Sequence, residues 1–371
     1  MRFRTSLVNV HLWVGLIAAP FLLVLGLTGA IMVFENEIAD ALDARVVRVQ
    51  PTGPALSLTA LEAKLSTAYP GYRLVGVNFP ADAGQSVAID LESPDSAHMA
   101  VFVDPYSGKV LGTAAEQNGI MQWIHGLHTH LQAGRAGSTV VAVFGLVLLF
   151  LSLSGLYLWW PTKIFSVRWT GTTKRVVFEA HNALGVYAWV FLLLFSATGA
   201  VIHWDRPVAG WIDRLTGETP LPPLPRSAPA CANQTILPAE QLLSVAAAAV
   251  PGARPTVLRM STTPTDPVRV IFKFPEDHTP AGRTQVFLEA CSAKPLLVRN
   301  ARQLPPSVRY TAMWNREIHT GDLFGWPSRI LASLFSLSLP LMALTGPLIW
   351  WTRRRRAGAS ASLPAAVPES S

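Results

Sequence analysis

Charged residues are scarce in this 371-residue chain: they make up 14% of it, whereas half of the residues are hydrophobic. The few charges are also unevenly placed, and four long blocks have almost none. These blocks cover residues 10–34, 138–160, 183–204 and 328–351. A helix rises about 1.5 Å per residue, so each block is long enough to cross a hydrocarbon core of about 30 Å. Helices inside soluble proteins rarely combine such length with so little polarity, which excludes one large soluble fold.

The first apolar block has no cleavage signal, although Arg2 and Arg4 precede it. A secretory signal has an apolar core of about 7–15 residues and a small-residue cleavage site. This block is longer and runs into Phe34-Glu35-Asn36-Glu37. We therefore predict a retained membrane helix.

Basic residues in the short segments fall on one side of a four-helix topology. They are Arg2, Arg4, Lys163, Arg168, Lys174, Arg175 and Arg353 to Arg356. Because such residues mark the cytoplasmic side, both termini are predicted to be cytoplasmic. The net charge of +7 follows from this topology and does not indicate nucleic-acid binding. The long segments 36–122 and 205–315 are then periplasmic.

Only two cysteines occur, Cys231 and Cys291, and both lie in the second long segment. A periplasmic location permits a disulfide, but the spacing leaves the pairing open.

The second half of the chain repeats the first, which indicates an internal duplication. An offset of 191 residues superposes two stretches near the second and fourth apolar blocks. They are Gly155–Trp160 on Gly346–Trp351, and His128-Thr129 on His319-Thr320. An offset of 170 residues does the same for the first and third blocks. It superposes His11 on His181, Gly15 on Gly185, and Thr28-Gly29-Ala30 on Thr198-Gly199-Ala200.

The two long segments repeat as well. Each begins with a helical pattern that ends at Pro-Gly, over Leu58–Tyr69 and Pro238–Val250. Strand-like runs follow, namely Arg73–Phe79, Ser86–Leu91, Met99–Val103, Thr256–Met260, Val268–Phe274 and Gln285–Leu288. We predict two small periplasmic α+β domains, each with one helix on an antiparallel sheet. Five prolines between Pro220 and Pro229 indicate an extended linker.

Histidines stand out at the ends of the apolar blocks, where an ionisable residue is a functional candidate. The repeat selects two equivalent pairs: His11 with His181 on the cytoplasmic side, and His128 with His319 on the outer side. Two imidazoles from facing helices are what six-coordinate haem iron requires. We therefore predict that the four are axial ligands of two haem b groups. The absence of Cys-x-x-Cys-His excludes covalent c-type haem.

Five further histidines are not repeated. His125, His130 and His203 are second-tier candidates for haem propionates, hydrogen bonds to the ligands or substrate contact. His98 and His278 lie in the periplasmic segments and are predicted to be surface residues. No catalytic residue is assigned.

The distance from His128 to Trp160 conflicts with a single helix. The 32 intervening steps would span about 48 Å, more than the membrane core. Either the outer haem lies at or above the outer surface, or Gly134 and Gly137 break the helix. The sequence leaves both open.

Several of these motifs resemble the PepSY-associated transmembrane family, and the match runs from about residue 3 to 356. They are His11–Leu16, Leu27-Thr28-Gly29, Leu127-His128, Ser154–Trp160, His181–Gly185 and Trp350-Trp351. The resemblance extends to inner-membrane ferric-siderophore reductases of that family, which implies haem b and a periplasmic active face. Some relatives append a flavin-binding reductase domain, and this chain carries none.

The resemblance implies a membrane oxidoreductase that passes electrons outward to Fe(III)-siderophore. Its donor would be a cytoplasmic reductase or a quinol. Another periplasmic acceptor, or electron flow into the quinone pool, is an alternative. A different class is a haem-free membrane anchor whose periplasmic domains bind peptide or modulate a protease.

The expected organisation is a four-helix membrane protein with two periplasmic domains. The segments are 1–35, helix; 36–122, first domain; 123–162, helix with its histidine segment; 163–178, cytoplasmic loop; 179–204, helix; 205–315, second domain with its linker; 316–352, helix; 353–371, basic tail.

Overall fold

The chain folds into two compact units in a computed structural model. It describes residues 2–114, 119–219, 221–227, 231, 235–261, 263, 266–279 and 281–361. One unit contains the apolar helices and comprises 1–34, 122–205 and 318 onward; the other comprises 35–121 and 206–317. Pro220 and Pro229 of the expected linker, and the last ten residues of the basic tail, lie outside the described residues.

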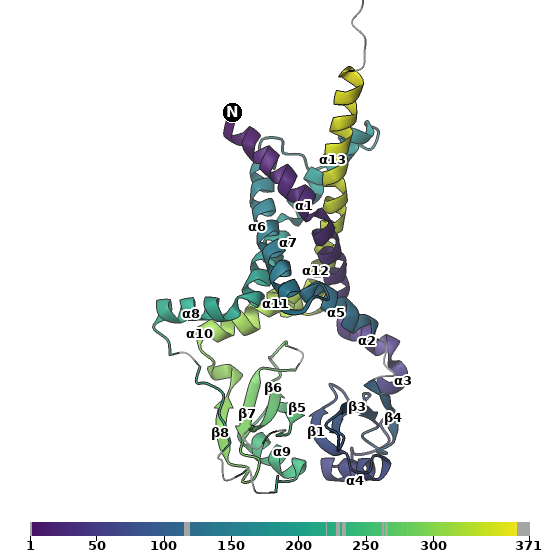
Figure 1. Ribbon diagram of the computed structural model, residues 1–371, viewed down its shortest axis with the longest axis vertical. Helices are drawn as coiled ribbons and strands as arrows, with labels where there is room; N and C mark the ends of the chain where they lie inside the picture. The colour runs from purple at the N-terminus through teal and green to yellow at the C-terminus, as the bar shows by residue number, and fades with distance from the viewer. Residues whose placement is uncertain are drawn as a thin grey trace, which may run out of the picture. The chain divides into compact units, whose positions relative to one another are not determined.

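Four membrane helices form the first unit, as the sequence predicts, and Figure 1 shows them running alongside one another. They are α1 (Arg2–Met32), α6 (Gly134–Trp159), α7 (Thr173–His203) and the fourth span at 326–352. The fourth is divided into α12 (Trp326–Ser336) and α13 (Ser338–Ala361), so the helix continues into the arginine cluster. Arg168 on the loop between α6 and α7 and Arg175 in the first turn of α7 both pair with the buried carboxylate of Glu179.

The centre of the helical unit is packed from residues spaced at the two sequence offsets. Two stacks of phenylalanine rings lie there, Phe21 on Phe144 and Phe191 on Phe335, with centroids 4.0 and 4.1 Å apart. The buried aliphatic residues around them are Ala18, Leu22, Leu148, Ala188, Leu192 and Leu339. Small residues allow close approach of the helices: a Cβ on Gly26 would lie 2.6 Å from Pro340, and one on Gly145 would lie 3.6 Å from the Ser196 carbonyl.

Short elements connect the membrane helices to the second unit. They are α2 (Glu35–Leu42), α3 (Ala44–Val47), α5 (Ile120–His130), α8 (Asp205–Thr216), η3 (Ala301–Gln303), α10 (Pro306–Val308), the π-helix η4 (Arg309–Trp314), α11 (Asn315–Thr320) and η5 (Asp322–Phe324).

The helix that carries His128 ends before α6 begins, so His128 and Trp160 do not lie on one continuous helix. Helix α5 ends at His130, and both Leu131 and Gln132 have positive φ angles before α6 begins at Gly134. The break lets α5 take a different direction from α6. His128 is thereby brought onto the end of α1, as described below.

The second unit is built on one eight-stranded antiparallel sheet, not on two separate domains as expected. Its order is β4-β3-β2-β1-β5-β6-β7-β8. The strands are β1 (Arg73–Asn78), β2 (Val87–Glu92), β3 (His98–Val103), β4 (Val110–Thr113), β5 (Arg254–Arg259), β6 (Val268–Lys273), β7 (Thr284–Leu288) and β8 (Pro295–Arg299). Helices α4 (Leu58–Ala68) and α9 (Ala239–Ala248) pack on it and contribute to a single apolar core. The sequence patterns gave no indication of β8.

The two halves of the sheet meet at β1 and β5. Their central pair is Val77 opposite Leu258, and both side chains are fully buried. These two residues are 181 positions apart, the same spacing as the first residues of β1 and β5. Arg259 strengthens the junction through Asp90 at 3.0 Å and Asn78 at 2.9 Å. Glu240 of α9 accepts hydrogen bonds from the amides of Leu58 and Thr59, which caps α4.

Cys231 and Cys291 form a disulfide with their Cα atoms 5.5 Å apart. The bond fastens the segment after α8 to the end of β7, and it settles the pairing that the sequence left open.

Candidate functional site

The inner histidines line one cavity inside the helical unit. His11 of α1 and His181 of α7 both contribute to a space of about 350 Å³ among α1, α6, α7 and α13. Two glycines keep this space open beside the rings. A Cβ on Gly155 would lie 3.5 Å from His11 Cε1, and one on Gly346 would lie 3.9 Å from His181 Cε1.

The walls of the inner cavity come in matched pairs from the two halves of the chain. Paired lining residues include Val8 with Phe178, Gly15 with Gly185, Leu22 with Leu192, Leu148 with Leu339, Leu151 with Met342, and Gly155 with Gly346. Every pair obeys one of the two sequence offsets. The cavity therefore presents two similar faces, with one histidine on each.

Ser152 and Trp189 are polar lining residues whose counterparts in the other half of the chain are apolar. The counterparts are Ala343 and Ala19. Ser152 Oγ and Trp189 Nε1 are buried and have no hydrogen-bond partner among the residues that the structure describes. Since buried polar atoms normally have partners, a group or water bound in the cavity would supply them. Arg4 is the permanently charged residue among the described lining residues.

The outer histidines, His128 of α5 and His319 of α11, face each other. Their ring centroids are 6.5 Å apart and the ring planes are inclined by 55°. Two imidazole nitrogens at about 2 Å from one metal ion would place the ring centroids roughly 6 Å apart. The spacing of this pair therefore suits a single metal ion between the rings.

In each of the four histidines, Nδ1 is hydrogen-bonded to the hydroxyl group of a residue on a neighbouring helix. The contacts are His11 to Ser154 at 2.8 Å, His181 to Thr345 at 2.8 Å, His128 to Thr28 at 2.9 Å, and His319 to Thr198 at 2.9 Å. The partners obey the same offsets as the histidines: Ser154 and Thr345 are 191 residues apart, and Thr28 and Thr198 are 170 apart. The same arrangement thus occurs four times.

The hydrogen bonds of these hydroxyls indicate which ring nitrogen of each histidine keeps its lone pair. Each hydroxyl donates its hydrogen to the carbonyl four residues earlier in its own helix. The distances are 2.7 Å for Ser154, 2.7 Å for Thr28, 2.5 Å for Thr198 and 3.0 Å for Thr345. A hydroxyl has one hydrogen, so its oxygen must accept from Nδ1–H of the histidine. The neutral imidazole then carries its lone pair on Nε2, the form that ligates a metal.

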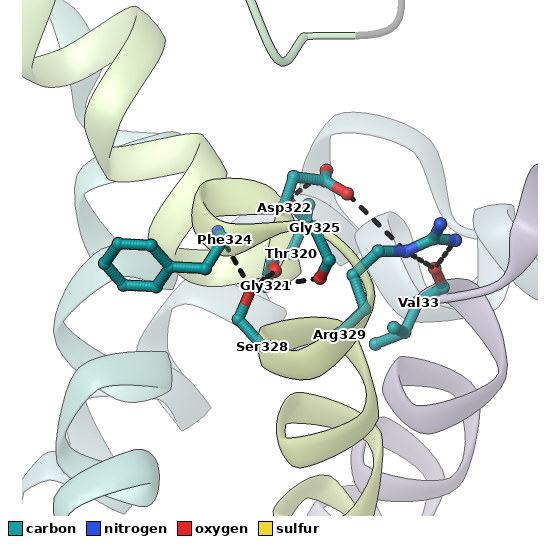
Figure 2. Close-up of polar contacts among 8 residues, drawn as sticks. All are labelled: Val33, Thr320, Gly321, Asp322, Phe324, Gly325, Ser328 and Arg329. Atoms are coloured by element: carbon teal, nitrogen blue, oxygen red, sulfur yellow. Dashed lines mark hydrogen bonds and ion pairs between the residues drawn. The ribbon is translucent and has the colours of Figure 1, made fainter.

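A polar network fixes the segment after His319 to the end of α1, as Figure 2 shows. Arg329 donates to the carbonyl of Val33 from Nε at 3.1 Å and from a terminal nitrogen at 2.6 Å, and it lies 3.6 Å from Asp322. Asp322 in turn accepts from Thr320 at 2.7 Å. The network thereby fixes the loop after His319 to the end of α1, the helix whose Thr28 contacts His128.

Ser328 completes the network by closing the loop that leads into α12. Its hydroxyl donates to the Gly321 carbonyl at 2.5 Å and accepts from the Phe324 amide at 2.9 Å. The guanidinium of Arg329 also lies over the Phe34 and Trp326 rings, at 5.0 and 5.1 Å. The direction of α11 is therefore firmly set.

The remaining histidines separate into two groups. His125 and His130 lie on α5 with His128, and the buried Nδ1 of His130 has no partner within the described part of the chain. His203, at the end of α7, contacts the Ser138 hydroxyl at 3.0 Å through Nδ1. His98 and His278 are exposed on the second unit.

The residues present fit haem b at both levels. Each pair offers two neutral imidazoles from different helices, and small residues leave room beside the inner rings. On α1, His11 lies 17 residues before Thr28, the partner of His128; on α7, His181 lies 17 residues before Thr198, the partner of His319. The two levels are therefore roughly 26 Å apart along the helices. Sequence reasoning missed the hydroxyl partners, although the Ser-Gly and Thr-Gly dipeptides recur at the offsets that revealed the repeat.

The four long apolar helices define a multi-pass helical membrane protein. The chain matches the PepSY-associated TM region family over residues 8–353 and belongs to that family. A search of the curated proteins finds no match.

Proposed function

We propose that this protein is a di-haem b conduit, which carries electrons across a bacterial inner membrane to a periplasmic acceptor. Ferric siderophore is the acceptor that we propose. The observation that carries the proposal is the fourfold histidine–hydroxyl arrangement, in which Nδ1 of two histidines is engaged at each of two levels and their Nε2 atoms are left for a ligand. Haem b, when bound there, supplies reversible one-electron chemistry.

The residues around each level define what the protein contributes. His11 and His181 would hold one iron, and His128 and His319 the other. Arg4 is the cation available to the carboxylates of the inner group, and Ser152 and Trp189 are free to donate hydrogen bonds inside the same cavity. Between the levels, the two phenylalanine stacks and their aliphatic neighbours form a packed, apolar medium.

In the proposed reaction, each electron that crosses the membrane reduces one metal ion. An electron from a cytoplasmic reductase reduces one Fe(III) to Fe(II) outside, and the siderophore releases Fe(II) because it binds that ion more weakly. A quinol donor would release two electrons and two protons, and would reduce two Fe(III) ions.

We further propose that gene duplication produced the two halves and that the eight-stranded unit is periplasmic and PepSY-like. The matched cavity walls and the equivalent strand pair Val77–Leu258 support the duplication. A disulfide in this unit agrees with an oxidising compartment.

Membrane orientation is the first prediction. A reporter fused after Arg356 should be active in the cytoplasm, and reporters inserted near Gly84 or Pro225 should be active in the periplasm, because basic residues flank the cytoplasmic ends of the helices. Alkaline phosphatase and a fluorescent protein that folds only in the cytoplasm provide paired readouts. The opposite pattern would reverse the proposed direction of electron flow.

Haem content is the second prediction and tests the proposed function directly. Because two histidine pairs are present, the pyridine haemochrome assay on the purified protein should give about two non-covalent haem b per chain. The reduced-minus-oxidised spectrum should be that of low-spin haem. A folded protein without haem would refute the conduit and support a haem-free membrane anchor, and a value near one would leave a single true site.

A further inference from the structure

We infer that Thr28-Gly29, Ser154-Gly155, Thr198-Gly199 and Thr345-Gly346 are positioning residues for the four histidines. In each dipeptide the hydroxyl fixes the histidine tautomer, and in the two outer dipeptides the glycine also leaves room for the ring. The role of these residues toward iron rests on the proposed function, whereas their effect on the tautomer does not.

The role of each hydroxyl follows from the hydrogen bond that it already donates within its own helix. Each hydroxyl hydrogen is committed to a carbonyl of its own helix, so only the oxygen lone pairs face the imidazole. A histidine in the Nε2–H form would bring two lone pairs together at 2.8–2.9 Å. The backbone carbonyl orients the hydroxyl, and the hydroxyl oxygen in turn selects the Nδ1–H form of the histidine.

The partner is a neutral hydroxyl at all four positions, never a carboxylate. A carboxylate on Nδ1–H raises the basicity of a metal-bound imidazole strongly, and partners of this kind commonly change metal affinity 10–100-fold. A hydroxyl orients the ring with a much smaller electrostatic effect. Removal of this bond is therefore expected to weaken iron binding and to shift the potential of one haem only.

The glycines distinguish the outer level from the inner level. A Cβ on Gly29 would lie 3.0 Å from His128 Cε1, and one on Gly199 would lie 3.2 Å from His319 Cε1. At the inner level the corresponding distances are 3.5 Å for Gly155 and 3.9 Å for Gly346, which are ordinary contacts. Alanine therefore displaces an outer histidine ring but leaves an inner ring in place.

The first arm of the test measures tautomers without haem. Apo protein labelled with ¹⁵N-histidine should show Nδ1–H for His11, His128, His181 and His319 in long-range ¹⁵N–¹H spectra. Thr28→Val keeps the side-chain shape but removes the acceptor, so His128 should shift toward Nε2–H while His319 does not change. Thr28→Ser should restore the wild-type signal. Nε2–H at His128 in the wild-type protein would overturn the inference, even if both haems bind.

The second arm measures haem. Thr28→Val and Thr198→Val should each weaken binding at the outer level about 10-fold, the lower end of the range for such partners, and shift only its midpoint potential, with rescue by serine. Thr139→Val is the matched control, because its hydroxyl bonds only to the Arg135 carbonyl of its own helix. Equal effects of Thr139→Val and Thr28→Val would overturn the inference.

The third arm uses the internal symmetry of the chain. Gly29→Ala and Gly199→Ala should reduce haem at the outer level, while Gly210→Ala, whose Cβ would meet no atom within 4 Å, should retain both haems. Thermal unfolding of each apo variant shows whether a loss is local, since the ring can move aside when no iron holds it. Equal losses at both levels in folded proteins would contradict the glycine assignment. If the wild-type protein binds no haem, the proposed function is refuted. The tautomer measurement on the apo protein then tests the inference alone.

Discussion

Replacement of His128 or His319 by alanine should remove one and the same haem, and leave the other in place. The two rings face each other at 6.5 Å, so either substitution leaves a metal ion with one axial imidazole. His11→Ala and His181→Ala should likewise remove the second haem. Each single variant should fall from about two haem b per chain to about one, and electron transfer across the membrane should decrease at least 100-fold.

The other histidines provide controls in the same assay. His98→Ala and His278→Ala should leave spectra and reduction unchanged, because both side chains are exposed on the second unit. His125→Ala, His130→Ala and His203→Ala should retain both haems, with a shifted potential or weaker reduction of the acceptor. If His125→Ala or His203→Ala emptied a site while His128→Ala did not, the assignment of the outer ligand would be wrong.

Loss of the Cys231–Cys291 bond should cause the largest change in stability. The bond closes a loop of 60 residues, and loop-closure entropy assigns such a bond about 4 kcal/mol. The double variant Cys231→Ser/Cys291→Ser should therefore melt about 10 °C lower in the transition of the eight-stranded unit. Differential scanning calorimetry of the full chain measures this change.

Two comparisons isolate the contribution of the bond. A reductant should lower the wild-type midpoint to that of the double variant, and it should leave the double variant unchanged. The haem content should be the same in all samples, since the helical unit has its own packed core. A shift below about 2 °C would show that the loop is already constrained by other contacts.

Much of the architecture could be predicted from the sequence. Membrane helices are revealed by composition alone, because each satisfies its backbone hydrogen bonds within one segment. The repeat was readable from exact matches such as Thr28-Gly29-Ala30 with Thr198-Gly199-Ala200, and His128-Thr129 with His319-Thr320. The histidine pairs followed from the same offsets without any chemical assumption, and the structure brings His128 and His319 together.

Other features depend on contacts that no local pattern records. The junction of β1 with β5 forms between strands that the sequence separates by 181 positions, so two apparent domains become one sheet. The hydroxyl partners were obscured because Ser154 and Thr345 differ in type, and because a membrane-helix hydroxyl usually serves only its own backbone. The break after His130 rests on positive φ angles at Leu131 and Gln132, two residues that seldom adopt them.

The four histidine–hydroxyl contacts have a consequence for the origin of the chain. His11 with Ser154, and His128 with Thr28, both lie within the first half, and the second half is equally self-contained. Each proposed iron site, however, takes one imidazole from each half. A half-length ancestor would have carried two correctly oriented histidines and no complete site. Under the duplication that we propose, only a symmetric pair of identical chains would have held a metal, and fusion of the two copies would have freed each half to diverge.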